Sequence, residues 1–590
     1  MLRKLLLVGA LQGWALWGIW KARELHIWPN TDISIERSLF YLCLALPLVI
    51  YLTEGLATLI RQRRLFVMGT ITILFPLLGA YSGWADNISK DGLDLYRVTF
   101  VRPSDLIAAT VLAFILIPLL IHFNSKSKSW TYHELFETAW RNVILCASAA
   151  FLTGIFWMVL FAGSALLRLI GLNFMQELIQ KAIFSIPVTA VAFATAYALS
   201  LARAEMVITL RRFQLSLLAW LLPLLMMFIV VWVVALPFTG VDSLFKTHHA
   251  AYIMLWCVAL CISFVNAAYQ DGLTAPSYGK YLGKLLAWGW LSLTVVVAVA
   301  GWAMWLRIDQ YGWSEDRVWG VFVMLMGLLY VLGYSASALR GKGWMVSIGK
   351  TNMWVAVVLC TGLVALLTPI ADARRISVNN QMQRLTNLTT PSDQFDFDYL
   401  RWHAGKYGHD ALLTIESGIN HPDHQTLASK AKQLLAQKQR YPNQEIVNKL
   451  TPAELRQRIR MLPETALLND ALLKTMQAEP GDWWLQQCLK ADTQCGIWLI
   501  DLNKDRALDA VVFIKNKWNN TATARVLQNT GGNYHAVGSL SLPASKTYDQ
   551  LLTDIAEGKF KMVTPIWSDI ELSDQHLHVI IDNKKNGLPP

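Results

Sequence analysis

The chain has few charged residues and lacks the usual sequence signatures of catalysis. Aspartate, glutamate, lysine and arginine make up 16% of the 590 residues and hydrophobic residues 54%, whereas a soluble protein has about 25% charged residues. There is no HExxH, no GxSxG, no P-loop and no glycine-rich dinucleotide fingerprint after a strand. Four common reaction classes therefore lose their ordinary sequence support, and we expect a protein that is not an enzyme.

Long apolar runs end near residue 371. The last of them, MWVAVVLCTGLVALLTPI at 353–370, has about the length that a helix needs to cross a hydrocarbon core of ~30 Å. A polar segment, ADARRISVNNQMQR, follows it. We therefore predict an α-helical polytopic membrane domain at 1–371, a soluble helical connector at 372–479 and a small α+β domain at 480–590.

Ten further apolar runs precede the last one. The first, LLLVGALQGWALWGIW, has no small-residue cleavage site after Trp20, so we predict a retained span rather than a signal peptide. Gly9 and Gly13 form a GxxxG spacing that permits close helix contact. The other nine runs predict spans near 38–60, 65–84, 105–123, 142–167, 182–201, 215–239, 249–268, 285–305 and 318–339.

Loop charges predict the orientation of these eleven spans. An odd number of spans places the two ends of the chain on opposite sides of the membrane. The face that holds the N-terminus carries 16 lysines and arginines and the other face carries 11, so the first face is expected to be cytoplasmic. The C-terminal domain is then periplasmic in a bacterial inner membrane. Since the net charge of +11 comes largely from such loops, we expect the lipid bilayer as a partner and no nucleic acid.

Glu54 is the clearest ionisable residue within a predicted span. An intramembrane carboxylate is costly in hydrocarbon, so it normally faces protein or water. One interpretation is structural, with the carboxylate reaching Arg61 or Arg203 at the cytoplasmic interface. The alternative is a proton or cation relay, which would make the chain a transporter or lipid-handling protein with a path near Glu54.

Acidic residues gather on the predicted outer face. A membrane-embedded transferase would need such carboxylates, and this is a further alternative. Solvated acidic loops are the simpler interpretation. The residues are Asp86, Asp91, Asp94, Asp105, Asp309, Glu315 and Asp316.

The pattern after residue 480 changes to short β-rich runs, with Thr530-Gly-Gly-Asn533 as a hairpin turn. Cys488 and Cys495 are the only two of the seven cysteines outside the apolar runs. Because the predicted topology places them in an oxidising compartment, we expect a disulfide between them. The alternative is a buried pair of thiols in a cytoplasmic domain.

A loop between two of these runs has the spacing of a calcium site. Side-chain oxygens at first, third, fifth and ninth positions can converge on one cation. Asp501, Asn503, Asp505 and Asp509 occupy these positions, and the loop resembles those of integrin-type FG-GAP repeats over nine residues. The alternative is an acidic turn whose side chains bond their own backbone, with the charge neutralised by Lys504 and Arg506.

Three segments carry a resemblance that covers most of the chain up to about residue 415. They are LLLVGALQG in the first run, QYGWSEDR before the tenth, and DYLRWHAGKYGHDAL after the last. They resemble the bacterial membrane-protein family known as domain of unknown function 4153. The resemblance implies a polytopic inner-membrane protein without an assigned activity. We interpret the chain as an envelope sensing, recruitment or scaffold protein whose C-terminal domain contacts an envelope protein partner.

Overall fold

The chain folds into two compact units, Met1–Arg440 and Tyr441–Pro590. The structure is a computed structural model. It describes residues 2–56, 61–86, 101–123, 129–240, 250–273, 278–340, 345, 347–437, 452–477, 484–489, 493–516, 521–540, 542, 546–561, 570–572 and 575–577.

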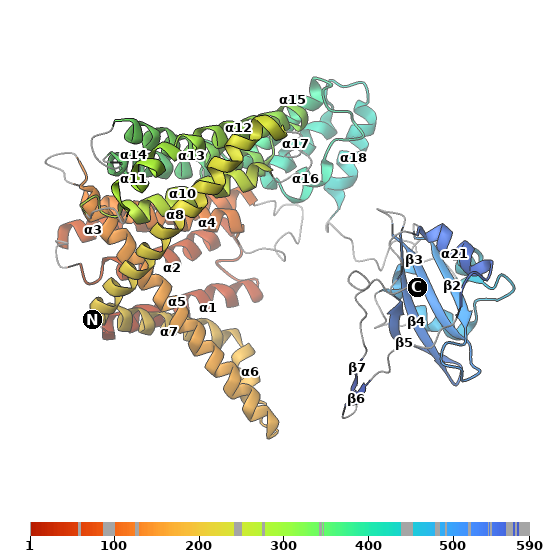
Figure 1. Ribbon diagram of the computed structural model, residues 1–590. Helices are drawn as coiled ribbons and strands as arrows, with labels where there is room; N and C mark the ends of the chain where they lie inside the picture. The colour runs from red at the N-terminus through yellow and green to blue at the C-terminus, as the bar shows by residue number, and fades with distance from the viewer. Residues whose placement is uncertain are drawn as a thin grey trace. The chain divides into compact units, whose positions relative to one another are not determined.

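Unit 1 is built from long apolar helices that lie side by side (Figure 1). In the described ranges, eleven helical stretches are long and apolar enough to cross a membrane, which is the number expected from the sequence. One of them, Lys280–Tyr311, consists of α11 (Lys280–Gly289) followed by α12 (Ser292–Tyr311). The others are α1 (Leu2–Glu24), α2 (Ile33–Thr53), α3 (Arg61–Asp86), α4 (Pro103–His122), α5 (Tyr132–Leu169), α7 (Ala182–Ala202), α8 (Ala204–Thr239), α10 (Ala250–Tyr269), α13 (Glu315–Leu339) and α14 (Ile348–Leu366); a short helix, α6 (Phe174–Gln180), precedes α7.

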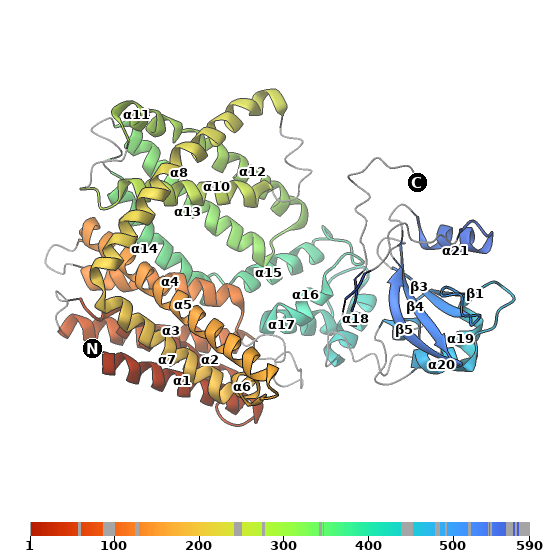
Figure 2. The same ribbon diagram turned by 60° about the horizontal axis from the view of Figure 1, so that its bottom comes forward.

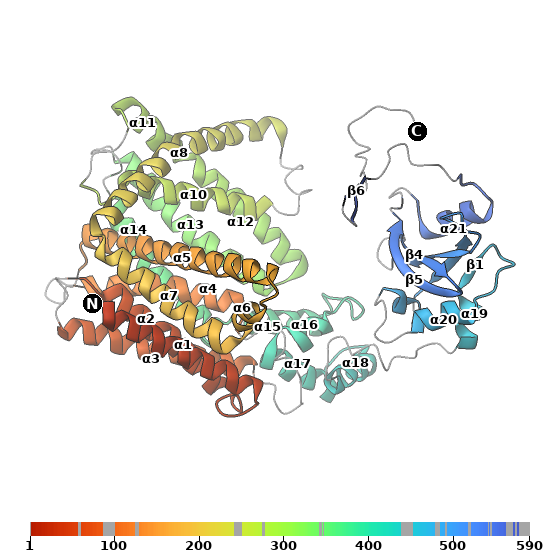
Figure 3. The same ribbon diagram turned by 90° about the horizontal axis from the view of Figure 1, so that it is seen from below.

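Small residues let neighbouring helices approach closely, as the GxxxG spacing in the first helix predicts. A Cβ added at Gly9 would lie 2.5 Å from the Ala194 Cβ of α7, and one at Gly13 would lie 2.6 Å from the Pro187 Cα. Gly83 packs in the same way against the backbone of α2, where an added Cβ would lie 2.5 Å from the Ile33 carbonyl oxygen. Figure 3 shows α1, α2, α3 and α7 side by side on one flank of the unit.

Unit 1 has two opposite faces at which its helices begin and end, and we name each face after a carboxylate that lies there. Ion pairs of Glu54 with Lys4 and Arg64 join α1, α2 and α3 at what we call the Glu54 end. The starts of α2, α4 and α13 meet the end of α3 around Asp86, at the Asp86 end. Figure 1 shows the Glu54 end on the side of the N-terminus.

Four short helices continue from the Asp86 end and belong to unit 1 rather than to a separate connector. They surround a core that includes Leu385, Leu400 and Leu412. The division expected at 372–479 therefore differs from the compact units, because residues up to 440 group with the apolar helices. The helices are α15 (Ala373–Thr386), α16 (Phe397–Trp402), α17 (Gly405–Ser417) and α18 (His424–Ala436) (Figure 2).

Unit 2 contains a five-stranded sheet with the order β1-β2-β3-β4-β5. Strand β1 runs parallel to β2, and the other neighbours are antiparallel. Gly531 and Gly532, with φ of 61° and 88°, form the tight turn between β4 and β5 that the sequence predicts. The elements are α19 (Pro452–Arg458), β1 (Arg460–Leu462), α20 (Asp470–Gln477), a 3₁₀ helix (Leu485–Leu489), β2 (Cys495–Ile500), β3 (Asp509–Lys515), β4 (Ala522–Thr530), β5 (Asn533–Leu540), α21 (Tyr548–Ala556) and a small hairpin of β6 (Ile570–Leu572) and β7 (Gln575–Leu577).

Candidate functional site

Charged side chains of the described residues gather at the Asp86 end of unit 1. Four carboxylates and three guanidinium groups from the ends of five helices meet there, partly or fully buried, which is expensive unless they pair. We call this set the Asp86 cluster. Its members are Asp86, Asp105, Glu315, Asp372, Arg37, Arg102 and Arg374.

Asp86 is the centre of the cluster because it faces all three arginines. Arg37 Nη1 lies 2.5 Å from Asp86 Oδ2, and Arg374 Nη1 lies 2.5 Å from Asp86 Oδ1. Arg102 Nε is 3.7 Å from Asp86 Oδ1. One carboxylate at the end of α3 thus ties together α2, the start of α4 and α15.

Asp372 and Arg374 attach α15 to the apolar helices. Asp372 caps α15, because its Oδ1 accepts a 2.8 Å hydrogen bond from the Arg374 backbone N–H. Its Oδ2 accepts from Arg374 Nη2 at 2.8 Å and from the Tyr81 hydroxyl at 2.7 Å. Burial by itself would raise the pKa of Asp372, but the hydrogen bonds from Arg374 and Tyr81 lower it overall. Asp372 is therefore ionised at neutral pH.

Further contacts bind α16 and α17 to the same end. Arg102 Nη1 lies 2.7 Å from Glu315 Oε2, and the Tyr399 hydroxyl donates to Glu315 Oε1 at 3.0 Å. The Tyr81 and Tyr407 hydroxyls are 2.9 Å apart. Since Tyr399 and Tyr407 belong to α16 and α17, polar contacts hold both short helices on the apolar helices.

The cavity inside the cluster is small. Its volume of about 20 Å³ is enough for about one water molecule, which needs two to four polar partners. Asp105, Glu315 and Arg374 are among the groups that line it. The arrangement is that of a charged joint between helices, because there is no room in this cavity for an organic substrate.

The structure divides the acidic residues expected on one face. Asp86, Asp105 and Glu315 belong to the cluster, whereas Asp309 and Asp316 are exposed, as the interpretation of solvated loops expects. Asp91 and Asp94 lie outside the described residues. Sequence reasoning missed Arg37, Arg102, Asp372 and Arg374. The signal that could have revealed the last two is their position directly after the last apolar run.

Glu54 lies at the end of α2 and not within it. The helix ends at Thr53, and Glu54 is its C-cap, with its backbone N–H bonded to the Ile50 carbonyl. Its Oε2 lies 2.7 Å from Lys4 Nζ and 2.6 Å from Arg64 Nη2, so its partners differ from the expected Arg61 or Arg203. Burial alone would raise the pKa of Glu54, but these two hydrogen bonds lower it overall. The contacts favour the structural interpretation of this residue.

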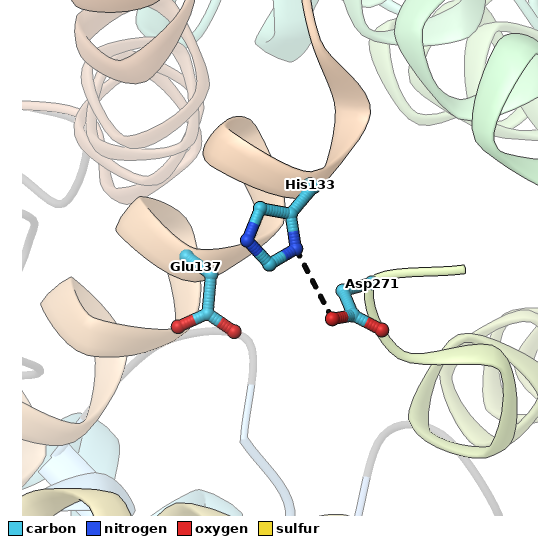
Figure 4. A group of neighbouring side chains, drawn as sticks. All are labelled: His133, Glu137 and Asp271. Carbon is cyan, nitrogen blue, oxygen red and sulfur yellow. Dashed lines mark hydrogen bonds and ion pairs between the residues drawn. The ribbon is translucent and has the colours of Figure 1, made fainter. Parts of the chain in front are cut away.

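A second polar group at the Glu54 end contains a histidine. His133 and Glu137 lie one turn apart on α5, and Asp271 follows α10 (Figure 4). His133 Nδ1 is 3.1 Å from Asp271 Oδ2, and Glu137 pairs with Arg211 of α8. Among the described residues, this is the one group of at least three His, Cys, Asp or Glu side chains whose ligand atoms all lie within 4.8 Å of one another.

The cysteines of unit 2 form the expected bond. The structure joins Cys488 to Cys495 in a disulfide with a Cα–Cα distance of 5.7 Å. Both side chains are buried in the core between the sheet and its helices. Closing so short a loop stabilises by roughly 2 to 3 kcal/mol on the chain-entropy model. The other five cysteines are free and lie in the apolar helices.

The acidic loop of unit 2 has the geometry of a self-bonded turn. Asp501 accepts from the backbone N–H groups of Asp505 and Arg506 at 3.1 and 3.0 Å. Asp505 accepts from Ala507 N–H, while Asn503 accepts from Asp505 N–H. Asp509 is buried and accepts from Leu502 and Asn529 N–H. These bonds correspond to the alternative interpretation of the loop, and calcium binding stays a prediction.

Titration of the full chain tests the calcium prediction. If calcium binds, it must replace some of the backbone partners of Asp501 and Asp505, so we expect a weak Kd of roughly 10⁻⁴ to 10⁻³ M. Asp505→Asn should then abolish the heat and the thermal stabilisation seen at millimolar calcium. Asp549→Asn, which changes an exposed aspartate outside the loop, is the matched control. If the unchanged chain and both variants respond equally to calcium, or if none of them responds, the loop is a self-bonded turn and not a calcium site.

These features define a class of protein with many apolar helices, a charged joint at one end and a small sheet unit. The family described as "Domain of unknown function (DUF4153)" matches residues 39–416, and the chain belongs to this family. The match covers the apolar helices from α2 onward and extends through α17, but not the sheet. No curated protein and no solved structure matches the chain.

Proposed function

We propose that the chain is a non-enzymatic protein of the bacterial inner membrane that holds its C-terminal module outside the cytoplasm, where the module senses or recruits another envelope component. The apolar helices serve as the anchor. The joint at the Asp86 end links this anchor to the segment that leads to unit 2.

Exposed apolar side chains support insertion into a bilayer. Leu11, Ile73 and Phe228, near the middle of α1, α3 and α8, are 63%, 64% and 59% exposed. Many further large apolar side chains of these helices are exposed, and in water so many would favour aggregation, whereas lipid tails cover them without cost. The belt of such residues therefore fits a bilayer as the solvent of unit 1.

The Asp86 cluster is the observation that carries the anchoring role. Arg374 is 5% exposed and pairs with both Asp86 and Asp372, so its charge is compensated inside the protein. The same residues would need open access to act on a substrate, and their cavity holds about one water. This closed pairing supports a fixed joint over the transferase alternative. Glu54 is likewise paired, at the end of a helix, which gives the relay alternative no added support.

Charge and disulfide chemistry support the orientation. Lys4, Arg64 and Arg211 lie at the Glu54 end, which the positive-inside tendency assigns to the cytoplasm. Eleven crossings then carry the chain to the opposite side after α14. The disulfide of unit 2 fits the oxidising compartment found there.

A reporter fused after Pro590 tests this topology. We expect a reporter that folds only outside the cytoplasm to be active at this site, and one that works only in the cytoplasm to be silent. A matched fusion after Arg340, at the end of α13, should give the reverse pattern. Cytoplasmic activity at Pro590 would contradict the proposed orientation.

A further inference from the structure

We propose that His133, Glu137 and Asp271 bind a divalent transition-metal ion at the Glu54 end of unit 1. The proposal goes beyond the anchoring function and does not depend on it. It starts from one geometric fact, which is that three ligand atoms from two distant parts of the chain lie within 4.8 Å of one another.

The local structure directs these three side chains toward one point. His133 and Glu137 are four residues apart on α5, so they lie on the same face of the helix. Asp271 follows α10 between Gln270 and Gly272, whose φ angles are 50° and 80°. These two left-handed residues turn the chain sharply. The Asp271 carboxylate faces His133 as a result, and the Leu273 N–H holds its other oxygen at 3.0 Å.

The donor set indicates the kind of ion. One imidazole nitrogen and two carboxylate oxygens suit zinc or manganese, whereas magnesium and calcium prefer oxygen donors alone. Zinc takes such ligands at about 2.0 to 2.2 Å. His133 Nδ1 and Asp271 Oδ2, at 3.1 Å, are already close enough for two ligands of one ion, and any of the three atoms that lie nearer 4.8 Å apart must draw closer when an ion binds. Three protein ligands leave at least one position for water.

Arg211 is the main competitor for this site. It pairs with Glu137 through Oε2, which leaves Oε1 of the same carboxylate as a second possible metal ligand. A fixed cation this close opposes the binding of a dication. The alternative is that the group consists of two ordinary ion pairs, His133 with Asp271 and Glu137 with Arg211. The two interpretations predict different effects of neutralising Arg211: a metal site would bind its ion more tightly, whereas two ordinary ion pairs would show no gain in affinity.

Calorimetric titration of the metal-free, detergent-purified full chain with ZnCl₂ and MnCl₂ separates them. We expect saturable binding of at least one of these ions, with little response to magnesium or calcium at the same concentration. His133→Ala and Asp271→Asn should each weaken binding by about tenfold or more, because even outer partners of metal ligands are worth 10- to 100-fold. Glu134→Gln is the matched control, since Glu134 lies on the same helix but faces His122 at 3.5 Å.

Arg211→Gln makes the test independent of misfolding. If the group is a metal site, this change should tighten binding by about tenfold or more, because it removes a like charge. A damaged protein would not gain affinity. The proposal is overturned if neither ion binds up to millimolar concentration, if His133→Ala and Asp271→Asn bind as tightly as the unchanged chain, or if Arg211→Gln leaves the affinity unaltered.

Discussion

Replacing Arg374 by alanine is expected to destabilise unit 1 by about 3 to 5 kcal/mol, the usual cost of removing one partner from a buried ion pair. The change leaves Asp372, itself 4% exposed, without its guanidinium partner and takes one arginine from Asp86. The negative charges of both carboxylates would then be buried with fewer positive charges beside them. Chemical or thermal unfolding of the purified chain in detergent measures the loss.

Arg375→Ala is the matched control for this experiment. Arg375 is the next residue of α15, and its guanidinium donates a long 3.3 Å bond to the Ile370 carbonyl near the surface. Its replacement should alter stability by no more than about 0.5 kcal/mol. If Arg374→Ala also costs less than about 1 kcal/mol, water screens the Asp86 cluster, and its pairs resemble weak surface salt bridges.

The sequence could predict the helices because the length of an apolar run is a local property. All eleven stretches are present, and the turn at Gly531 and Gly532 and the bond between Cys488 and Cys495 are where the sequence places them. Each of these features depends on residues that are close in the chain. Strand runs and tight turns have the same local character.

The Asp86 cluster could not be predicted because its members are far apart in the chain. Arg37 and Arg374 lie 49 and 288 positions from Asp86. The sequence shows that charged residues lie near the helix ends. Which of them form ion pairs depends on which helix ends become neighbours in the fold. The helices α15, α16 and α17 dock on the apolar helices through contacts that are also distant in the chain. The sequence therefore predicted a connector separate from the membrane domain.

Two local errors have physical causes. The apolar composition near Glu54 continues after it, so the expected span ran to residue 60, but the helix ends at Thr53, before Gly55 with φ of 75°. For α5 the expected span was too short at its start. The helix begins at Tyr132, ten residues before the expected span, and this extension carries His133 and Glu137. A search for apolar runs overlooks polar helical turns of this kind.

Gly405→Ala is expected to loosen the docking of α17 on α3 and to cost roughly 2 to 5 kcal/mol, from left-handed strain and overpacking together. Gly405 has a φ of 58°, and an added Cβ would lie 2.4 Å from the Ala85 carbonyl oxygen. Real Cβ atoms do not approach backbone oxygen so closely, so α17 must move away from the end of α3. Asp86 is the next residue of α3, and its contact with Arg374 is therefore expected to lengthen as well.

Gly171→Ala separates the two causes of this loss. Gly171 has a similar positive φ of 82°, but an added Cβ there would meet no atom within 4 Å. It should therefore cost only about 1 to 2 kcal/mol, the strain of a left-handed alanine. Limited proteolysis adds a positional readout, because a detached α17 exposes backbone near 403–408 to cleavage while Gly171→Ala leaves that segment protected. Equal losses of stability and equal protection in the two variants would mean that the contact between Gly405 and Ala85 contributes nothing to the joint, and that α17 is held by the hydroxyl pair of Tyr81 and Tyr407 and by its apolar core.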